Sequence, residues 1–214
     1  MYKDKLLPGE TYHIYNRANG SENLFREWEN YRYFLAKLVE RTAPALKILA
    51  YCLMPNHFHI LIRVRTAPEI KYYIWDQLLK NGKRALPPGV PIKQWPSFVA
   101  QRQLANMMVG YAKAYNKKYD RRGSLLQQNT KRKLIDSEAY LRKACLYIHF
   151  NPVHHNFTPA PEYWPHSSYK AYLGNKPTTW LSQTELLHSF GGRAGFRAAH
   201  EQHQAAIYQA TNAL

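Results

Sequence analysis

The sequence predicts an α+β fold in which helices pack mainly on one face of an antiparallel sheet. Two observations support this class. Segments rich in β-forming residues alternate with longer segments whose apolar residues recur at helical spacing, in the order β-α-β-β-(α)-α-β-α. In addition, only the short link Met54-Pro55-Asn56 separates two adjacent strand segments, which implies an antiparallel hairpin. The 214 residues suffice for one domain with a sizeable core.

The first part of the chain supplies three strands and one helix. Residues 11–17, TYHIYNR, form the first strand, which Asn19-Gly20 ends. Residues 29–41 form a helix, and the hairpin strands follow at 46–53 and 57–64. The apolar face of the helix consists of Tyr33, Phe34, Leu38 and Val39.

The middle of the chain is predicted to be mainly helical. Residues 68–80 read as a helix, and residues 81–96 read as a loop because glycine and proline recur there. A long helix follows at 97–119 with Ser97 as its N-cap, and a basic turn at 116–123 ends it. The candidate core residues of this helix are Phe98, Leu104, Met108, Tyr111 and Tyr115.

The last part of the chain adds a fourth strand at 131–135 and a helix at 139–150. Asp136-Ser137-Glu138 starts this helix, and Asn151-Pro152 stops it, because proline disfavours helical geometry in the residue before it. Residues 180–214 read as one or two helices with a break at Gly191-Gly192. We therefore expect a main domain at 1–175 and a helical C-terminal extension at 176–214.

The charge balance points to a polyanionic partner. The chain carries 30 Lys and Arg residues against 14 Asp and Glu residues, a net charge of +16 and a pI near 9.8. Folding does not call for such an excess, which raises self-repulsion. Nucleic acid is the usual partner of so basic a chain, and an anionic membrane surface is the competing one.

Nothing in the sequence indicates export or a membrane span. No run approaches the roughly 20 apolar residues that a span requires, and the first residues lack the apolar stretch of a signal peptide. The two cysteines, Cys52 and Cys145, do not amount to a disulfide framework. These features predict a cytoplasmic protein that binds no membrane.

Two histidines in the hairpin form a candidate metal site. His57 and His59 project from the same face of the strand at 57–64, because side chains two residues apart share a face. Two imidazoles on a stiff strand can hold one divalent metal ion. A pair of this kind also arises by chance in a chain with ten histidines.

A second polar pair lies downstream, at Tyr147 and Asn151. These residues are four apart and so lie one helical turn from each other on one face. A protonated phenol is a poor nucleophile, and a metal ion on the two histidines would polarise a phosphate beside it. Asn151 could add an oxygen ligand, and mixed nitrogen and oxygen ligands suit Mn²⁺ or Mg²⁺. Taken singly, each residue equally fits an ordinary structural role, with Tyr147 packed on the sheet and Asn151 at a helix end.

Five segments together resemble the single-tyrosine HUH transposases, and among them the REP-associated tyrosine transposases. The segments are HIYNR at 13–17, AYCLMPNHFHILI at 50–62, RRGSL at 121–125, DSEAYLRKACLYIHFNPV at 136–153 and WPHSSYKAYLG at 164–174. The resemblance covers residues 11–174. It implies a sheet like that of ferredoxins or RNA-recognition motifs, with the histidine pair on a central strand.

The resemblance also implies a set of residue roles and a reaction. His57, His59 and Asn151 would bind a divalent metal ion, Mg²⁺ or Mn²⁺, and Tyr147 would be the nucleophile. The substrate would be single-stranded DNA with hairpin or palindromic repeats. The tyrosine attacks a backbone phosphorus, stays bonded to the 5′ phosphate and releases a 3′ hydroxyl, and a later hydroxyl attack rejoins the strand. Such a protein is an endonuclease and strand transferase in DNA transposition and recombination.

Two points stay open within the resemblance. Relatives act as monomers or as homodimers, and in a homodimer Tyr147 can meet the histidines of the other chain.

A protein that binds single strands combines a basic groove with aromatic platforms for the bases. Lys131-Arg132-Lys133 is the least ordinary basic group, because a short strand rarely needs three adjacent cations. The candidates for the groove are Arg17, Arg63, Arg65, Lys117, Lys118, Arg121, Arg122, Lys131, Arg132 and Lys133.

Two other functions compete with the transposase. A non-catalytic, domesticated relative would bind DNA hairpins on the same fold without forming a covalent adduct. A metal-dependent phosphoesterase would use His57 and His59 with water as the nucleophile. ATP use is not indicated, because the chain has no Walker-type phosphate loop.

Overall fold

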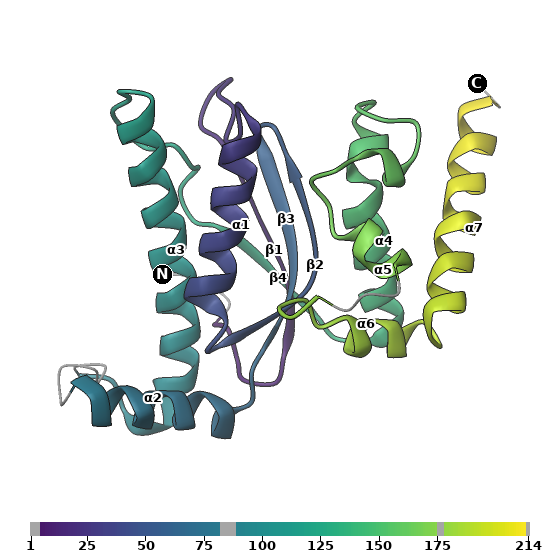
Figure 1. The fold of residues 1–214 in the computed structure, drawn as a ribbon. Helices are drawn as coiled ribbons and strands as arrows, with labels where there is room; N and C mark the ends of the chain where they lie inside the picture. The colour runs from purple at the N-terminus through teal and green to yellow at the C-terminus, as the bar shows by residue number, and fades with distance from the viewer. Residues whose placement is uncertain (1–4, 82–88, 175–177, 213–214) are drawn as a thin grey trace.

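The computed structural model describes residues 5–81, 89–174 and 178–212 (Figure 1). Its strands are β1 (Thr11–Arg17), β2 (Leu46–Met54), β3 (His57–Val64) and β4 (Lys131–Ile135). Its α-helices are α1 (Trp28–Thr42), α2 (Ala67–Asn81), α3 (Trp95–Lys118), α4 (Glu138–His154), α5 (Tyr169–Leu173), α6 (Gln183–Ser189) and α7 (Arg193–Asn212). Short 3₁₀ turns, η2 (Ile92–Gln94) and η3 (Pro161–Tyr163), lie between them.

The strands form one four-stranded sheet in the order β2-β3-β1-β4, and every neighbouring pair is antiparallel. The predicted hairpin is confirmed, because β2 and β3 pair directly across Pro55-Asn56. The α+β class, the antiparallel sheet and the helical C-terminal region are confirmed with it. The order places β3 and β1 in the centre of the sheet, so the histidine pair lies on a central strand.

Helices cover both faces of the sheet, which corrects the expectation that they pack mainly on one. α1 and α3 lie on one side, and α4 lies on the other (Figure 1). The reason is visible in β3, where Phe58 lies 5.1 Å from Phe34 of α1 between ring centroids, while His59 meets α4 on the opposite face. β2 and β3 are buried along almost their whole length, so both of their faces need a cover.

The two helices on the first face largely follow their predicted apolar stripes. In α1, Phe34 and Leu38 are buried, but Tyr33 is exposed and so lies off the core face. In α3, four of the five candidate residues are buried and Phe98 is half-buried. The predicted N-cap of α3 is wrong: Gln94 caps the helix, and Ser97 lies inside it. Pro96 explains the earlier start, because proline is well tolerated in a first helical turn.

The loop predicted at 81–96 is shorter than expected. α2 extends to Asn81, and η2 and the start of α3 occupy residues 92–96. The predicted loop residues at 82–88 lie outside the described residues.

α4 does not stop at Asn151-Pro152 but continues to His154, which corrects the predicted end. Proline removes one backbone hydrogen bond, but Phe150, Asn151 and Pro152 are all buried, and their packing outweighs the local preference. The start of α4 is as predicted, because the Ser137 hydroxyl oxygen caps the helix by accepting the Tyr140 N–H at 3.2 Å. The longer helix keeps Asn151 in register one turn after Tyr147.

The segment after α4 closes the exposed edge of the sheet. The Leu53 N–H donates to the His166 carbonyl at 2.9 Å, and the Ser168 N–H donates to the Tyr51 carbonyl at 3.0 Å. An edge strand with unpaired backbone groups invites pairing with other chains, so this cover protects β2. The motif at 164–174 thus has a structural task in the fold.

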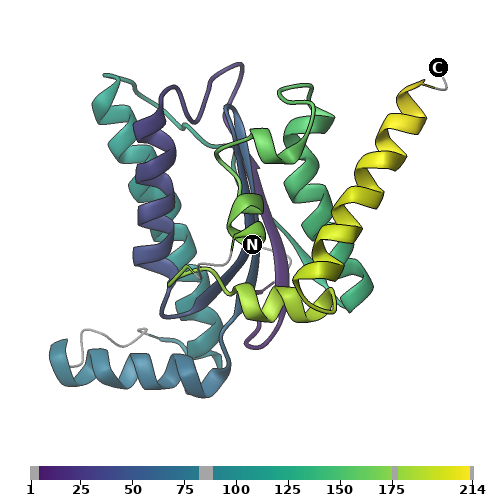
Figure 2. The same ribbon diagram turned by 45° about the vertical axis from the view of Figure 1, so that its right-hand side comes forward.

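α7 is the outermost helix and lies beyond α4 on the side away from the sheet (Figures 1 and 2). The predicted break before it is confirmed, because Gly191 and Gly192 both adopt positive φ angles, +72° and +98°. The domain boundary predicted at 175/176 lies outside the described residues. Among the helices of the described part of the chain, none has the length and hydropathy to cross a bilayer.

Candidate active site

The face of the sheet that meets α4 gathers polar side chains from three strands. His57 and His59 project from β3 on this face, and the strand register pairs them with Arg17 and Tyr15 of β1. On the other side of β1, Lys131 of β4 pairs with Tyr15. Directly paired residues share a face, so two imidazoles, a phenol and two cations lie next to one another.

α4 brings the downstream pair onto the same face. The ring centroid of Tyr147 lies 5.4 Å from that of His59 and 6.0 Å from that of His13. One turn later, Asn151 Oδ1 lies 2.8 Å from His57 Nε2. Tyr147 is 42% exposed, so its hydroxyl can meet a molecule from solvent. The four residues singled out in the sequence therefore converge within one chain.

The surroundings of His57 fit a bound cation. Its Nδ1 lies 2.7 Å from Asn56 Oδ1, and its Nε2 lies 2.8 Å from Asn151 Oδ1. Burial lowers the pKa of His57, so the ring is neutral at pH 7 and has one proton for two acceptor oxygens. With both amide oxygens facing the ring, one of the two contacts joins two lone pairs, and a divalent cation between the atoms would stabilise this arrangement.

The amide of Asn151 supports the same interpretation. Its Nδ2 is buried and has no hydrogen-bond partner among the described residues. Turning the amide over would leave the oxygen without a partner instead, so one buried polar atom stays unsatisfied either way. Nitrogen and oxygen donors of this kind suit Mn²⁺ or Mg²⁺.

His13 on β1 orients His59. His13 Nε2 lies 2.9 Å from His59 Nδ1, and both rings are buried. Burial lowers the pKa of His59 to about 2 and that of His13 to about 4, so both rings are neutral at pH 7 and share one proton between these nitrogens. With the proton on His59 Nδ1, which then donates to His13 Nε2, this contact fixes the His59 ring and leaves its Nε2 open to a metal ion.

A cavity of about 490 Å³ opens beside the histidines. Arg17 and Lys131 contribute positive charge to its wall, and Tyr15 and Phe157 contribute aromatic surface. Phe157 is 51% exposed, so its ring is accessible to a base. Cations beside exposed rings are the combination that holds the phosphates and bases of a single strand.

Sequence reasoning missed three residues around the site. His13 and Asn56 touch the two candidate ligands, and the ring of His155 lies 5.1 Å from that of His57. His13 could have been found, because it shares a strand face with Tyr15 and Arg17. His155 was missed because the helix was predicted to end before it.

The candidate basic residues divide between the site and other places. Arg17, Lys131 and Lys133 lie on the site face, where Lys133 pairs with His13. Arg132 lies on the opposite face, with its Nη1 3.3 Å from Gln101 Oε1 of α3. Arg63 lies at the other end of β3, roughly 20 Å from His57 by strand rise, and forms an ion pair with Glu185 at 2.8 Å.

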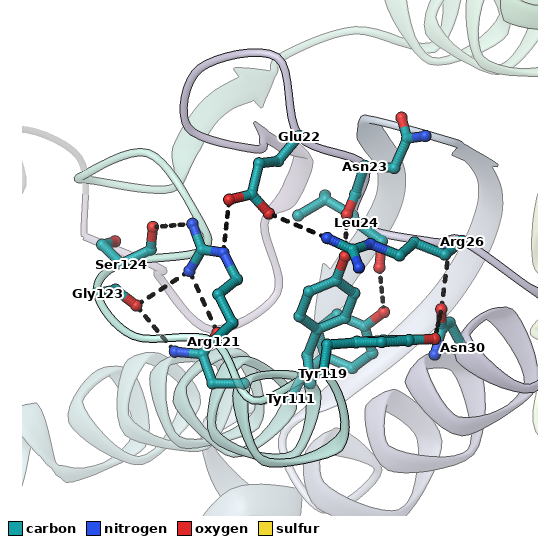
Figure 3. A network of polar contacts seen from close by, with 12 residues as sticks. Glu22, Asn23, Leu24, Arg26, Asn30, Tyr111, Tyr119, Arg121, Gly123 and Ser124 are labelled. Carbon is teal, nitrogen blue, oxygen red and sulfur yellow. Dashed lines mark hydrogen bonds and ion pairs between the residues drawn. The ribbon is translucent and has the colours of Figure 1, made fainter.

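The basic turn after α3 is tied into the protein by Arg121 (Figure 3). Its Nε donates to Glu22 at 2.6 Å, and its two terminal nitrogens donate to Asn116, Gly123 and Ser124. These contacts organise the turn, and a DNA contact of Arg121 stays a prediction. Arg122 and Lys117 are exposed, whereas Arg65 and Lys118 form ion pairs with Glu69 and Glu27.

Comparisons with known proteins bear on the fold. No protein-family profile matches the chain, and no curated protein sequence matches it. Among solved structures, a REP-associated tyrosine transposase bound to a REP hairpin is similar to this chain with a TM-score of 0.53 at 15% sequence identity. The match covers 82% of this chain and 86% of that chain. The likeness shows that this chain has the fold of a tyrosine transposase.

Proposed function

We propose that the chain is a metal-dependent transposase of the REP-associated tyrosine type. It would cut and rejoin single-stranded DNA that contains hairpins, through a covalent 5′-phosphotyrosine intermediate. One observation carries the proposal: Tyr147, His57, His59 and Asn151 converge on a sheet that has the fold of such a transposase. The hairpin that accompanies the similar structure supports hairpin DNA as the substrate.

Each residue has a stated part in the proposed reaction. His57, His59 and Asn151 would hold a divalent ion, which when bound polarises the scissile phosphate. The Tyr147 oxygen attacks phosphorus as the phenol loses its proton, and the bond from phosphorus to the 3′ oxygen breaks. The leaving 3′ oxygen takes up a proton. The phosphotyrosine bond preserves the energy of the broken bond, so rejoining requires only a new attacking hydroxyl.

The proposed arrangement acts in cis. Tyr147 lies against the histidines of its own chain, which supports a site that one monomer completes. The exposed cations at Arg17, Lys131 and Lys133 would hold the backbone, and the rings of Tyr15 and Phe157 would stack on bases.

The direct test is a covalent-adduct assay. The purified chain is incubated with Mn²⁺ and single-stranded hairpin DNA from the flanks of its own gene, labelled at the 5′ or the 3′ end. We expect a protein band on a denaturing gel that carries the fragment on the 3′ side of the cut, and no band when EDTA is present. Binding without any adduct would indicate the non-catalytic hairpin-binding protein. Cleavage without an adduct would indicate a hydrolase.

Replacing His13 tests how the second ligand is held. We expect His13→Ala to raise the Mn²⁺ concentration needed for half-maximal cleavage about 10- to 100-fold, because His59 loses the contact that fixes its ring. A Mn²⁺ titration of cleavage measures this, and excess Mn²⁺ should restore part of the rate. His188→Gln on α6, an exposed histidine, is the control and should change nothing. An equal loss at every Mn²⁺ concentration would show that His13 does not act through the metal.

The basic strand offers a test of the DNA path with a matched control. Lys131→Gln and Lys133→Gln should each weaken single-strand binding and lower the salt slope by about 0.7, the value for one lost phosphate contact. Arg132→Gln makes the same charge change on the opposite face and should alter the slope less. Fluorescence anisotropy over a range of salt concentrations gives both quantities. Equal effects at all three positions would mean that the DNA does not follow the site face.

A further inference from the structure

A second group of metal-ligating side chains lies between α4 and α7. Cys145 and His149 of α4 and His200 of α7 are all buried, and one ligand atom from each lies within 4.8 Å of the others. His149 Nδ1 is 2.9 Å from His200 Nε2 and 3.6 Å from Cys145 Sγ. Along α4, Cys145 and His149 each stand two residues from Tyr147, about 200° around the helix. The cluster therefore faces away from the candidate active site.

Each histidine has one ring nitrogen that points away from the cluster, His149 Nε2 and His200 Nδ1, and each of these nitrogens contacts an oxygen atom. His200 Nδ1 donates to the Phe196 carbonyl at 2.8 Å, because a carbonyl can only accept. His149 Nε2 lies 2.8 Å from the Ser168 hydroxyl, which also lies 3.3 Å from the Tyr51 carbonyl and accepts the Tyr51 N–H. When the serine proton lies toward the Tyr51 carbonyl, His149 Nε2 donates to Ser168, and this is the tautomer that a metal ion on His149 Nδ1 requires. Histidines that bind metals are typically held by such a hydrogen bond from the second ring nitrogen.

The inward-facing nitrogens are then left without a proton. If both rings are neutral, His149 Nδ1 and His200 Nε2 direct lone pairs at each other across 2.9 Å. In this tautomer a further proton between them would create a cation at two fully buried rings, which is costly. A metal ion removes the conflict, because it accepts both lone pairs and the sulfur of Cys145.

We propose that Cys145, His149 and His200 bind a thiophilic d¹⁰ metal ion, Zn²⁺ or Cu⁺, that fastens α7 to α4. A thiolate with two imidazoles selects ions of this class over Mg²⁺ or Mn²⁺. Zn²⁺ would need a fourth ligand, such as water or a backbone carbonyl, whereas Cu⁺ accepts fewer ligands. The thiol proton leaves for solvent as the metal–sulfur bond forms, with no change in oxidation state. Metal binding at this site does not depend on the proposed DNA chemistry, so each proposal can be tested separately.

The test is the metal content of the full chain, purified without a histidine tag. We expect about one equivalent of zinc or copper by elemental mass spectrometry, and loss of it in Cys145→Ser and in His200→Gln. The double variant His57→Ala, His59→Ala should retain the metal, which separates this site from the candidate active site. His203→Gln is the matched control, because His203 lies one turn after His200 on α7 but outside the cluster. The element found distinguishes Zn²⁺ from Cu⁺.

A second measurement covers the case in which a variant folds poorly. Co²⁺ added to metal-free wild-type protein should produce a thiolate-to-cobalt charge-transfer band, and His203→Gln should produce the same band. Wild-type protein with neither metal nor band would overturn the proposal and leave a hydrogen-bonded chain in which Ser168 donates to His149. Metal retained at full stoichiometry in both Cys145→Ser and His200→Gln would overturn it as well.

Discussion

Tyr147→Phe is expected to abolish the covalent protein–DNA adduct and to reduce strand cleavage by more than about 10³-fold. The change removes a single oxygen atom, the one proposed to bond to phosphorus. The ring keeps its contacts with His59 and His13, so the site should retain its shape. DNA affinity should stay within about twofold, because the basic and aromatic residues of the cavity are untouched. Denaturing gels measure the adduct, and anisotropy measures binding.

A matched tyrosine sharpens this experiment. Tyr163 of η3 is 64% exposed and lies on a different element, so Tyr163→Phe should cleave DNA like the unchanged protein. An adduct that persists in Tyr147→Phe would assign the nucleophile to another residue. Cleavage that persists without an adduct would mean that water attacks the phosphate, as in a hydrolase.

The sequence predicted the parts of the site that depend on local spacing. His57 and His59 share a strand face, and Tyr147 and Asn151 share a helix face, because these relations follow from the periods of the two structures. Their meeting across β3 and α4 is a tertiary contact, which no local period predicts. The resemblance to HUH transposases supplied that expectation, and the geometry agrees with it.

The wrong predictions share a physical cause. The local effect of Pro152 predicted that α4 ends there, but the helix continues because Phe150 and Pro152 pack in the core. The same extension brings His155 beside His57, so one local error concealed one site residue. The nearly continuous apolar runs of β2 and β3 indicate burial on both faces, and the expectation of helices mainly on one face did not take account of them.

The pattern of basic residues did not indicate to which face of the sheet each side chain points. The sequence does not distinguish Lys131, Arg132 and Lys133. In the strand, alternate side chains point to opposite faces, so Arg132 lies on the face that meets α3. Arg121 and Arg122 are neighbours, yet the first is held by Glu22 and the second is exposed. A cation contributes to DNA binding only where it lies on the path of the strand, and that depends on the tertiary fold.

The second large effect is expected at the two candidate metal ligands. His57→Ala and His59→Ala should each reduce Mn²⁺-dependent cleavage by about 10²- to 10⁴-fold, because the scissile phosphate loses the ion that polarises it. EDTA should have the same effect on the unchanged protein. His155 lies beside the site but is not one of the three proposed ligands, so His155→Gln should reduce the cleavage rate much less. Cleavage that survives in either alanine variant at low Mn²⁺ concentrations would exclude that histidine as a ligand.

Stability measurements test the same site without any reliance on activity. The folded chain brings His57, His59 and Asn151 together and the unfolded chain does not, so an ion bound to them should stabilise the fold. With Mn²⁺ at about 100 times its dissociation constant, the gain is about 2.7 kcal/mol, or about 5–10 °C in Tm for a chain of this size. Differential scanning fluorimetry should show this shift in the unchanged protein and not in His57→Ala. Without metal, His57→Ala should cost less than this gain, because its ring offers only its contacts to Asn56 and Asn151. A large Tm loss in the metal-free variant, with no Mn²⁺ shift in the unchanged protein, would instead make His57 a structural residue.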